Sequence, residues 1–84
     1  MLSEPATPGY HRATMKRVRV ESSSLSSVGY DADTRTLEIA FREGGVYRYY
    51  GVPADVYEGL MAADSHGSYF THSIRPHYRF QRID

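Results

Sequence analysis

The 84-residue sequence contains no cysteine and no tryptophan. The absence of cysteine excludes a disulfide framework, a thiol nucleophile and any zinc site built on thiolates. No apolar run approaches the roughly 18–20 residues that a membrane-spanning helix needs, and the first residues lack the apolar core of a secretion signal. A chain of this length holds one small domain. We therefore expect a single-domain cytoplasmic protein without membrane attachment.

The sequence does contain an excess of tyrosine and an uneven distribution of charge. Eight tyrosines stand against three phenylalanines, and ten cations balance ten acids. Cations outnumber acids in residues 1–20 and 65–84, whereas residues 21–64 hold three arginines and eight acids. Basic ends on a neutral chain can hold an anionic partner locally. Solvation of the chain ends explains the same pattern without a partner.

Three short strands are predicted in the first half of the domain. A strand near residues 26–30 follows an irregular or edge segment, and strict alternation of apolar and polar residues predicts a second strand over 36–42. The third strand spans 46–50. Aspartates in 31–34 and glycines in 43–45 predict the turns, because these residue types tolerate the backbone angles of tight turns. The pattern is typical of an antiparallel meander.

The apolar spacing then changes from a period of two to that of a helix. Pro53 suits the first turn of a helix, where its missing N–H costs nothing. Apolar residues recur on one helix face: Val56, Leu60 and Ala63. Ser65 is a candidate N-cap for a second helix over about 66–75, and Pro76 ends that helix.

The two ends of the chain are less regular. Residues 1–14 contain two prolines, one glycine and scattered apolar residues without periodicity, which predicts a disordered lead before a domain over 15–84. The tail over 77–83 alternates aromatic and polar residues. It predicts either a final short strand or an extended arm laid on the domain.

Together these elements predict an α+β fold in which two C-terminal helices cover one face of a three-stranded antiparallel meander. The predicted core between the layers consists of Leu37, Ile39, Phe41, Tyr47, Tyr49, Val56, Leu60, Phe70 and Ile74. The other face of the sheet is expected to carry to solvent Glu38, Ala40, Arg42, Arg48 and Tyr50.

Three ordered strings cover most of the predicted domain: SSSLSSVGYD, TRTLEIAFREGGVYRYYGVP and VYEGLMAADSHGSYFTHSIRPHYRF. Over about residues 18–83 they resemble the KTSC domain, which is named after the carboxy-terminal domain of certain lysyl-tRNA synthetases and also occurs in free-standing small bacterial proteins. The Y-x-Y hallmark of that family is matched by Tyr47 and Tyr49. The synthetase context implies RNA binding. The sequence departs from the family at His66 and His72, where the last helix often has more basic residues around it.

Two groups of residues are candidates for RNA binding. The stretch 75–82 interleaves arginines with aromatic residues and contains no acid. Arginine pairs with phosphate, and aromatic rings stack on bases. The exposed sheet face also offers arginines beside an aromatic ring, as several RNA-binding folds do. The candidate RNA-binding residues are Arg42, Arg48, Tyr50, Arg75, Tyr78, Arg79 and Arg82.

Each of these candidates also has a purely structural explanation. Tyr47 and Tyr49 can stack on bases, but core aromatic residues with hydroxyls near the surface explain them more simply. The arginines of the sheet face can form cross-strand ion pairs. In the tail, aromatic residues can pack on the core while the arginines stay solvated.

Catalysis is not predicted. Asp64, Ser65 and His66 supply the residue types of a hydrolase triad, but sequence neighbours rarely reach triad geometry, and Ser65 is better explained as a helix cap. The spacing of His66 and His72 does not place two ligands on one helix face, and no carboxylate completes a metal site. The turn at 43–45 lacks the lysine and the length of a phosphate-binding loop. We expect no metal and no cofactor.

The sequence therefore predicts a non-catalytic binding module that engages RNA, with tRNA-like structure as the expected class. The alternative is a protein-interaction or homodimerisation module with no nucleic-acid role, because the edges of a small sheet can pair with a partner strand or a second copy. Tyrosine-rich surfaces are also common at protein interfaces.

Overall fold

The computed structural model describes residues 16–84, so the lead predicted over 1–14 lies outside the described residues. Five strands form one antiparallel sheet: β1 (Arg17–Arg19), β2 (Leu25–Asp31), β3 (Thr36–Phe41), β4 (Val46–Tyr50) and β5 (Arg79–Arg82). The helical elements are α2 (Ala54–Ala62), α3 (His66–Tyr69) and the π-helical turn η1 (Phe70–Ile74). The strands lie in the sheet in their chain order, β1-β2-β3-β4-β5.

The α+β class and the central meander are confirmed, but the predicted number of three strands is wrong. An edge strand is added on each side, β1 beside β2 and β5 beside β4. All residues of β1 and β5 are exposed. β1 is only three residues long, and the aromatic–polar alternation of the tail fits an extended arm as well as a strand. The sequence leaves open whether the tail is a strand or an extended arm. In the structure its residues 79–82 form the strand β5.

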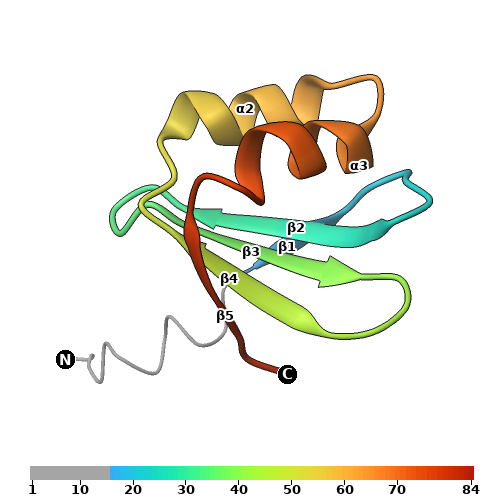
Figure 1. Ribbon diagram of the computed structural model, residues 1–84, viewed down its shortest axis with the longest axis horizontal. Helices are drawn as coiled ribbons and strands as arrows, with labels where there is room; N and C mark the ends of the chain where they lie inside the picture. Colours follow the sequence, from blue (N-terminus) through green and yellow to red (C-terminus); the bar gives the residue numbers. More distant parts are fainter. Residues whose placement is uncertain (1–15) are drawn as a thin grey trace, which may run out of the picture.

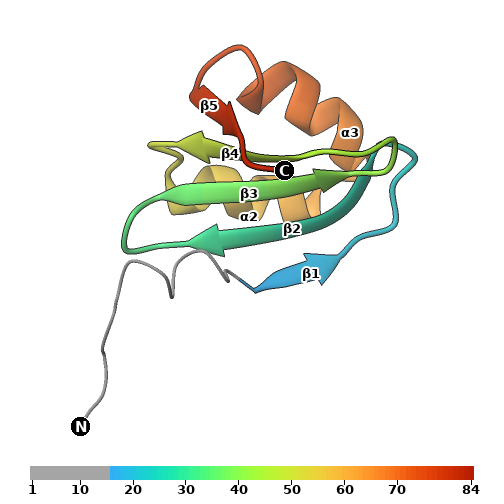
Figure 2. The same cartoon turned by 90° about the horizontal axis from the view of Figure 1, so that it is seen from below.

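The helical elements cover one face of the sheet, and β1 to β5 present the other face without a covering helix in the described chain (Figures 1 and 2). None of the helices within residues 16–84 has the length and apolar character needed to cross a membrane. The core between the two layers contains Val20, Leu25, Val28, Leu37, Ile39, Tyr49, Val52, Leu60, Phe70 and Ile74.

The predicted core differs from the observed core in two ways: it includes residues that are only partly buried, and it leaves out others that are buried. Phe41, Tyr47 and Val56 are only partly buried and pack against the core from its rim. The prediction omitted four buried residues, which are Val20, Leu25, Val28 and Val52. They occur singly in serine-rich or irregular segments, where no periodic pattern marks them.

Local signals place the helix ends as the sequence indicates. α2 begins directly after Pro53, which is its N-cap residue. The predicted N-cap of the second helix is confirmed, because the Ser65 hydroxyl accepts a 3.1 Å hydrogen bond from the Ser68 amide. Gly59 in the middle of α2 has a packing role: a Cβ there would lie 2.2 Å from the Tyr69 hydroxyl oxygen. The glycine therefore leaves room for the Tyr69 ring against α2.

Candidate functional site

A cleft of about 560 Å³ opens on the helix-covered side of the sheet, where β4 and β5 meet η1 and the turn after β3. Its volume lies within the range of small-molecule and nucleotide sites. The lining residues are Phe41, Glu43, Gly44, Tyr47, Tyr49, Phe70, Arg75, Phe80 and Arg82. Five of these are aromatic, two are cations and one is an acid.

The aromatic rings of the cleft pack on one another in a closed circuit. The centroid distances are 5.6 Å for Phe41–Tyr47, 5.4 Å for Phe41–Phe70, 5.3 Å for Tyr49–Phe70, 5.7 Å for Tyr49–Phe80 and 5.9 Å for Tyr47–Phe80. Such tilted and edge-on contacts stabilise aromatic clusters. Tyr49 is 4% exposed, whereas Phe80 is 58% exposed. The circuit is thus anchored in the core at one side and open to solvent at the other.

Arg82 lies over one wall of this cleft. Its guanidinium carbon is 5.9 Å from the centroid of the Tyr47 ring, a cation–π arrangement. Its Nε donates a 3.0 Å hydrogen bond to the Asp84 carbonyl, and this bond does not use the two terminal guanidinium nitrogens. Gly45 provides the room, because a Cβ there would lie 3.1 Å from Cε1 of Tyr47 and 3.5 Å from the guanidinium of Arg82.

Arg75 and Glu43 complete the charged groups of the cleft. Arg75 follows η1, and its backbone N–H closes that π turn on the Phe70 carbonyl at 2.9 Å. Glu43 comes from the turn after β3, whose glycines have positive φ. Within residues 16–84 neither side chain forms an ion pair or hydrogen bond with the protein. Both remain available to a ligand.

Burial raises the pKa of Tyr49 to about 12, and the neighbouring Tyr47 adds to the shift while Arg75 opposes it. The Tyr49 hydroxyl is therefore protonated across the physiological range. Tyr49 therefore lines the cleft as a neutral side chain rather than as an anion.

The raised pKa of Tyr49 predicts a loss of stability at alkaline pH. Below pH 10 the tyrosine is neutral in both the folded and unfolded chain. Between pH 10 and 12 the unfolded chain loses the proton while the folded protein retains it, so the free energy of unfolding falls by about 2 kcal/mol. Urea denaturation between pH 9 and 12 measures this loss.

Tyr49→Phe provides the control for the alkaline prediction. The variant should lose less stability over the same pH interval, with a remainder from Tyr30, whose pKa burial also raises. Equal alkaline slopes in the wild type and Tyr49→Phe would contradict the assignment.

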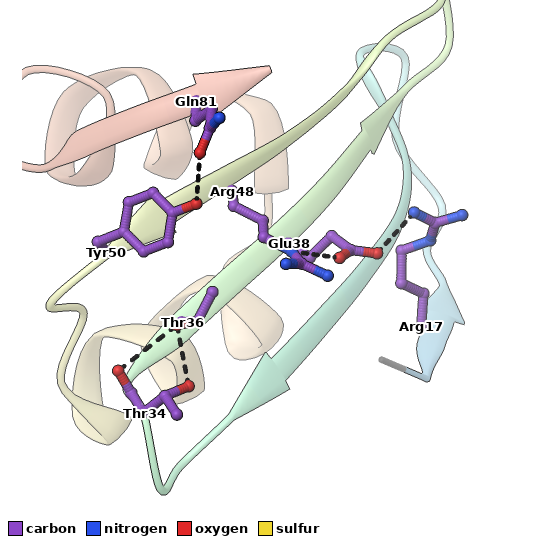
Figure 3. Close-up of polar contacts among 7 residues, drawn as sticks. All are labelled: Arg17, Thr34, Thr36, Glu38, Arg48, Tyr50 and Gln81. Carbon is purple, nitrogen blue, oxygen red and sulfur yellow. Dashed lines mark hydrogen bonds and ion pairs between the residues drawn. The ribbon is translucent and has the colours of Figure 1, made fainter. Parts of the chain in front are cut away.

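The uncovered face of the sheet is organised around a buried acid. The strand register places Arg17, Gly29, Glu38, Arg48 and Gln81 side by side across the five strands. Glu38 accepts hydrogen bonds from Arg17 at 2.8 Å and from Arg48 at 2.9 Å (Figure 3). It is only 3% exposed, so the expectation that this side chain faces solvent is wrong. The two arginine side chains cover it.

Other polar residues of this face are also held by neighbours. The Tyr50 hydroxyl donates to the Gln81 amide oxygen at 3.1 Å (Figure 3). Arg42, just beyond β3, donates from Nε to the Ser22 carbonyl. These contacts use part of the hydrogen-bonding capacity that the sequence suggested for a ligand.

Apart from Tyr78, the structure divides the candidate RNA-binding residues between two surfaces. Arg75 and Arg82 line the cleft. Arg48, Tyr50 and Arg79 lie on the uncovered face, since Arg79 is the register partner of Tyr50 and Arg48 pairs with Glu38 there.

One candidate lies on neither surface, and two residues of the cleft are not among the candidates. Tyr78 packs, half-buried, against the core. Sequence reasoning did not select Phe80 and Glu43 as site residues. The alternation of the tail is a signal for Phe80, but its neighbours became visible only through the pairing of β5 with β4.

The residues weighed for catalysis are used structurally. The Ser65 hydroxyl caps α3, and Nδ1 of His66 lies 2.7 Å from the Leu60 carbonyl at the end of α2. In the part of the chain that the structure describes, no three side chains gather as metal ligands.

Comparisons with known proteins agree on one family. The KTSC domain model matches residues 21–78. An uncharacterised protein of Stutzerimonas stutzeri is 49% identical over 71 residues, which are 83% of this chain and 100% of that protein. The crystal structure of a KTSC domain protein from Yersinia pestis has a TM-score of 0.81 and 43% identity, covering 83% of this chain and 99% of that chain. A lysine–tRNA ligase of Nostoc punctiforme is 35% identical over 66 residues, which are 79% of this chain and 12% of the ligase.

The fold and the cleft define a small α+β module with an aromatic, arginine-flanked site. The chain belongs to the KTSC domain family, as the sequence resemblance predicted. The family is related to a domain of lysine–tRNA ligases, and it is not a known catalytic family.

Proposed function

We propose that this protein is a non-catalytic module that binds single-stranded RNA in the aromatic cleft. The observation that carries the proposal is the meeting of an exposed ring, Phe80, with two arginines, Arg75 and Arg82, around one concavity. Stacking of a base on an aromatic ring contributes about 1–3 kcal/mol. Arginines at the rim of such a platform pair with phosphates through charge-assisted hydrogen bonds.

The cleft suits an unpaired nucleotide better than a duplex. Unstacked bases can enter a concavity and stack on side chains, whereas duplex RNA is recognised mainly by its backbone and shape. Tyr47 and Tyr49 also line the cleft, and a tyrosine hydroxyl can both donate to and accept from a base. The relation to a segment of lysine–tRNA ligases supports RNA as the polymer and single-stranded parts of tRNA as the expected class.

The test is a titration with a fluorescent RNA pool that includes tRNA, at two salt concentrations. We expect affinity that falls steeply with salt, as phosphate contacts require. The double variant Arg75→Glu/Arg82→Glu should lose at least tenfold in affinity at low salt. Arg75→Glu alone should lose part of that affinity, and it leaves the contacts of Arg82 with Tyr47 and Asp84 intact.

Arg79→Glu is the matched control. It makes the same charge change as Arg75→Glu and lies on the strand that carries Arg82, but on the uncovered face, and it should weaken binding by less than threefold. Equal losses in Arg79→Glu and Arg75→Glu would assign binding to general electrostatic attraction and contradict the assignment of the RNA site to the cleft. Failure of the wild type to bind RNA at low salt would refute the function.

The rival function, a protein-interaction or homodimerisation module, is separated by a pull-down before and after nuclease treatment. Both exposed edges carry arginines, Arg17 and Arg19 on β1 and Arg79 and Arg82 on β5. Antiparallel pairing of either edge with its own copy brings like charges together, which disfavours self-association. We expect a monomer in sedimentation at tens of micromolar.

A further inference from the structure

The cleft contains a carboxylate, although a negative charge weakens the binding of phosphates. Glu43 lines the same concavity as Arg75 and Arg82, and within residues 16–84 it pairs with neither. An acid at this position repels RNA phosphates. It strengthens binding only where the ligand places hydrogen-bond donors against it.

The Watson–Crick edges of the four RNA bases differ in this respect. Guanine presents two adjacent donors, N1–H and the N2 amino group, which match the two oxygens of a carboxylate. Adenine, cytosine and uracil each present one donor group beside acceptors that a carboxylate repels. Carboxylates are therefore bidentate acceptors for guanine, just as arginine is a bidentate donor to its other edge.

We infer that the cleft selects guanine, with Glu43 as the residue that reads its Watson–Crick edge. The base stacks on Phe80, Glu43 accepts from N1–H and N2–H, and Arg75 and Arg82 hold the adjoining phosphates. The inference rests on the proposed RNA binding and names the base that this same site prefers. Glu43 belongs to the turn after β3, whereas Phe80 and Arg82 belong to β5, so the carboxylate that reads the base and the arginine that holds a phosphate come from different elements of the cleft.

The experiment compares fluorescent pentanucleotides that differ only at the central base: UUGUU, UUAUU, UUCUU and UUUUU. All four carry the same phosphates, so the electrostatic contribution is constant. The wild type should bind UUGUU about tenfold more tightly than UUAUU, the low end of the discrimination expected from a bidentate pair. Glu43→Gln should lower the affinity for UUGUU to that for UUAUU. The affinity for UUAUU itself should equal or exceed that of the wild type, because a repelling charge is removed.

Glu58→Gln is the matched control, because Glu58 lies exposed on α2 and does not line the cleft. It should leave the order of the four affinities unchanged. Salt-dependent binding without a preference for guanine would overturn this inference and leave the RNA function intact. Equal strengthening of all four ligands by Glu43→Gln would also overturn it, since Glu43 would then act only as a repelling charge. No binding of any pentanucleotide would overturn the function and the inference together.

Discussion

Glu38→Gln is expected to lower the free energy of unfolding by about 3 kcal/mol, a large share of the stability of a domain this small. The carboxylate is almost fully buried between Arg17 and Arg48. Its removal leaves two like charges in one row of the sheet. Arg17 is one third exposed and can turn into solvent, but the Arg48 side chain is only 19% exposed. Most of the loss comes from this arginine, because its largely buried charge loses the contact with the Glu38 carboxylate.

Urea denaturation at neutral pH measures this change. The matched control is Glu43→Gln, the same substitution at an exposed acid without a protein partner in the described residues, and it should stay within about 0.5 kcal/mol of the wild type. Arg17→Ala should lower the free energy of unfolding by less than Glu38→Gln does. A Glu38→Gln protein as stable as the wild type would show that the ion pairs contribute nothing net.

Gly29→Ala is expected to detach β1 and to destabilise the domain by about 2 kcal/mol. A Cβ at this position would lie 2.6 Å from the Lys16 carbonyl oxygen and 3.0 Å from Cγ of Arg17. The first of these atoms is backbone, so β1 must move away from β2. The glycine also provides the gap over which Arg17 crosses β2 to reach Glu38. The substitution therefore weakens the edge pairing and one ion pair together.

Trypsin cleavage reports the detachment directly, because β1 contains two arginines. We expect cleavage after Arg17 and Arg19 to accelerate at least tenfold in Gly29→Ala, together with faster amide hydrogen exchange in β1. Ser27→Ala is the control: it lies two residues away on the same face of β2, opposite Arg19, and it adds no atom. Unchanged trypsin kinetics in Gly29→Ala would mean that β1 accommodates the methyl group.

Only some residues of the candidate site can be predicted from the sequence. The basic, aromatic tail indicates Arg75 and Arg82, whereas the family hallmark marks Tyr47 and Tyr49 only as structural residues. These residues line one cleft only because β5 pairs with β4, and 28 residues of helix and loop separate the two strands in the chain. Glu43 was interpreted only as part of a turn, because nothing local indicates that this turn faces the tail.

By itself the sequence determined the central hairpins, the helix ends and the change from strand to helix. These depend on interactions within a few residues: alternation in β3 and β4, glycines in the turn at 43–45, and the Ser65 cap. Only the tertiary structure decided the edge strands, the burial of Glu38 and the cleft. β1 has only three residues, and the alternation in β5 fits an extended arm as well as a strand. An acid on an open face is buried only when arginines from neighbouring strands extend across it. Such long-range pairing is specified jointly by distant segments, so no single stretch of the chain reveals it.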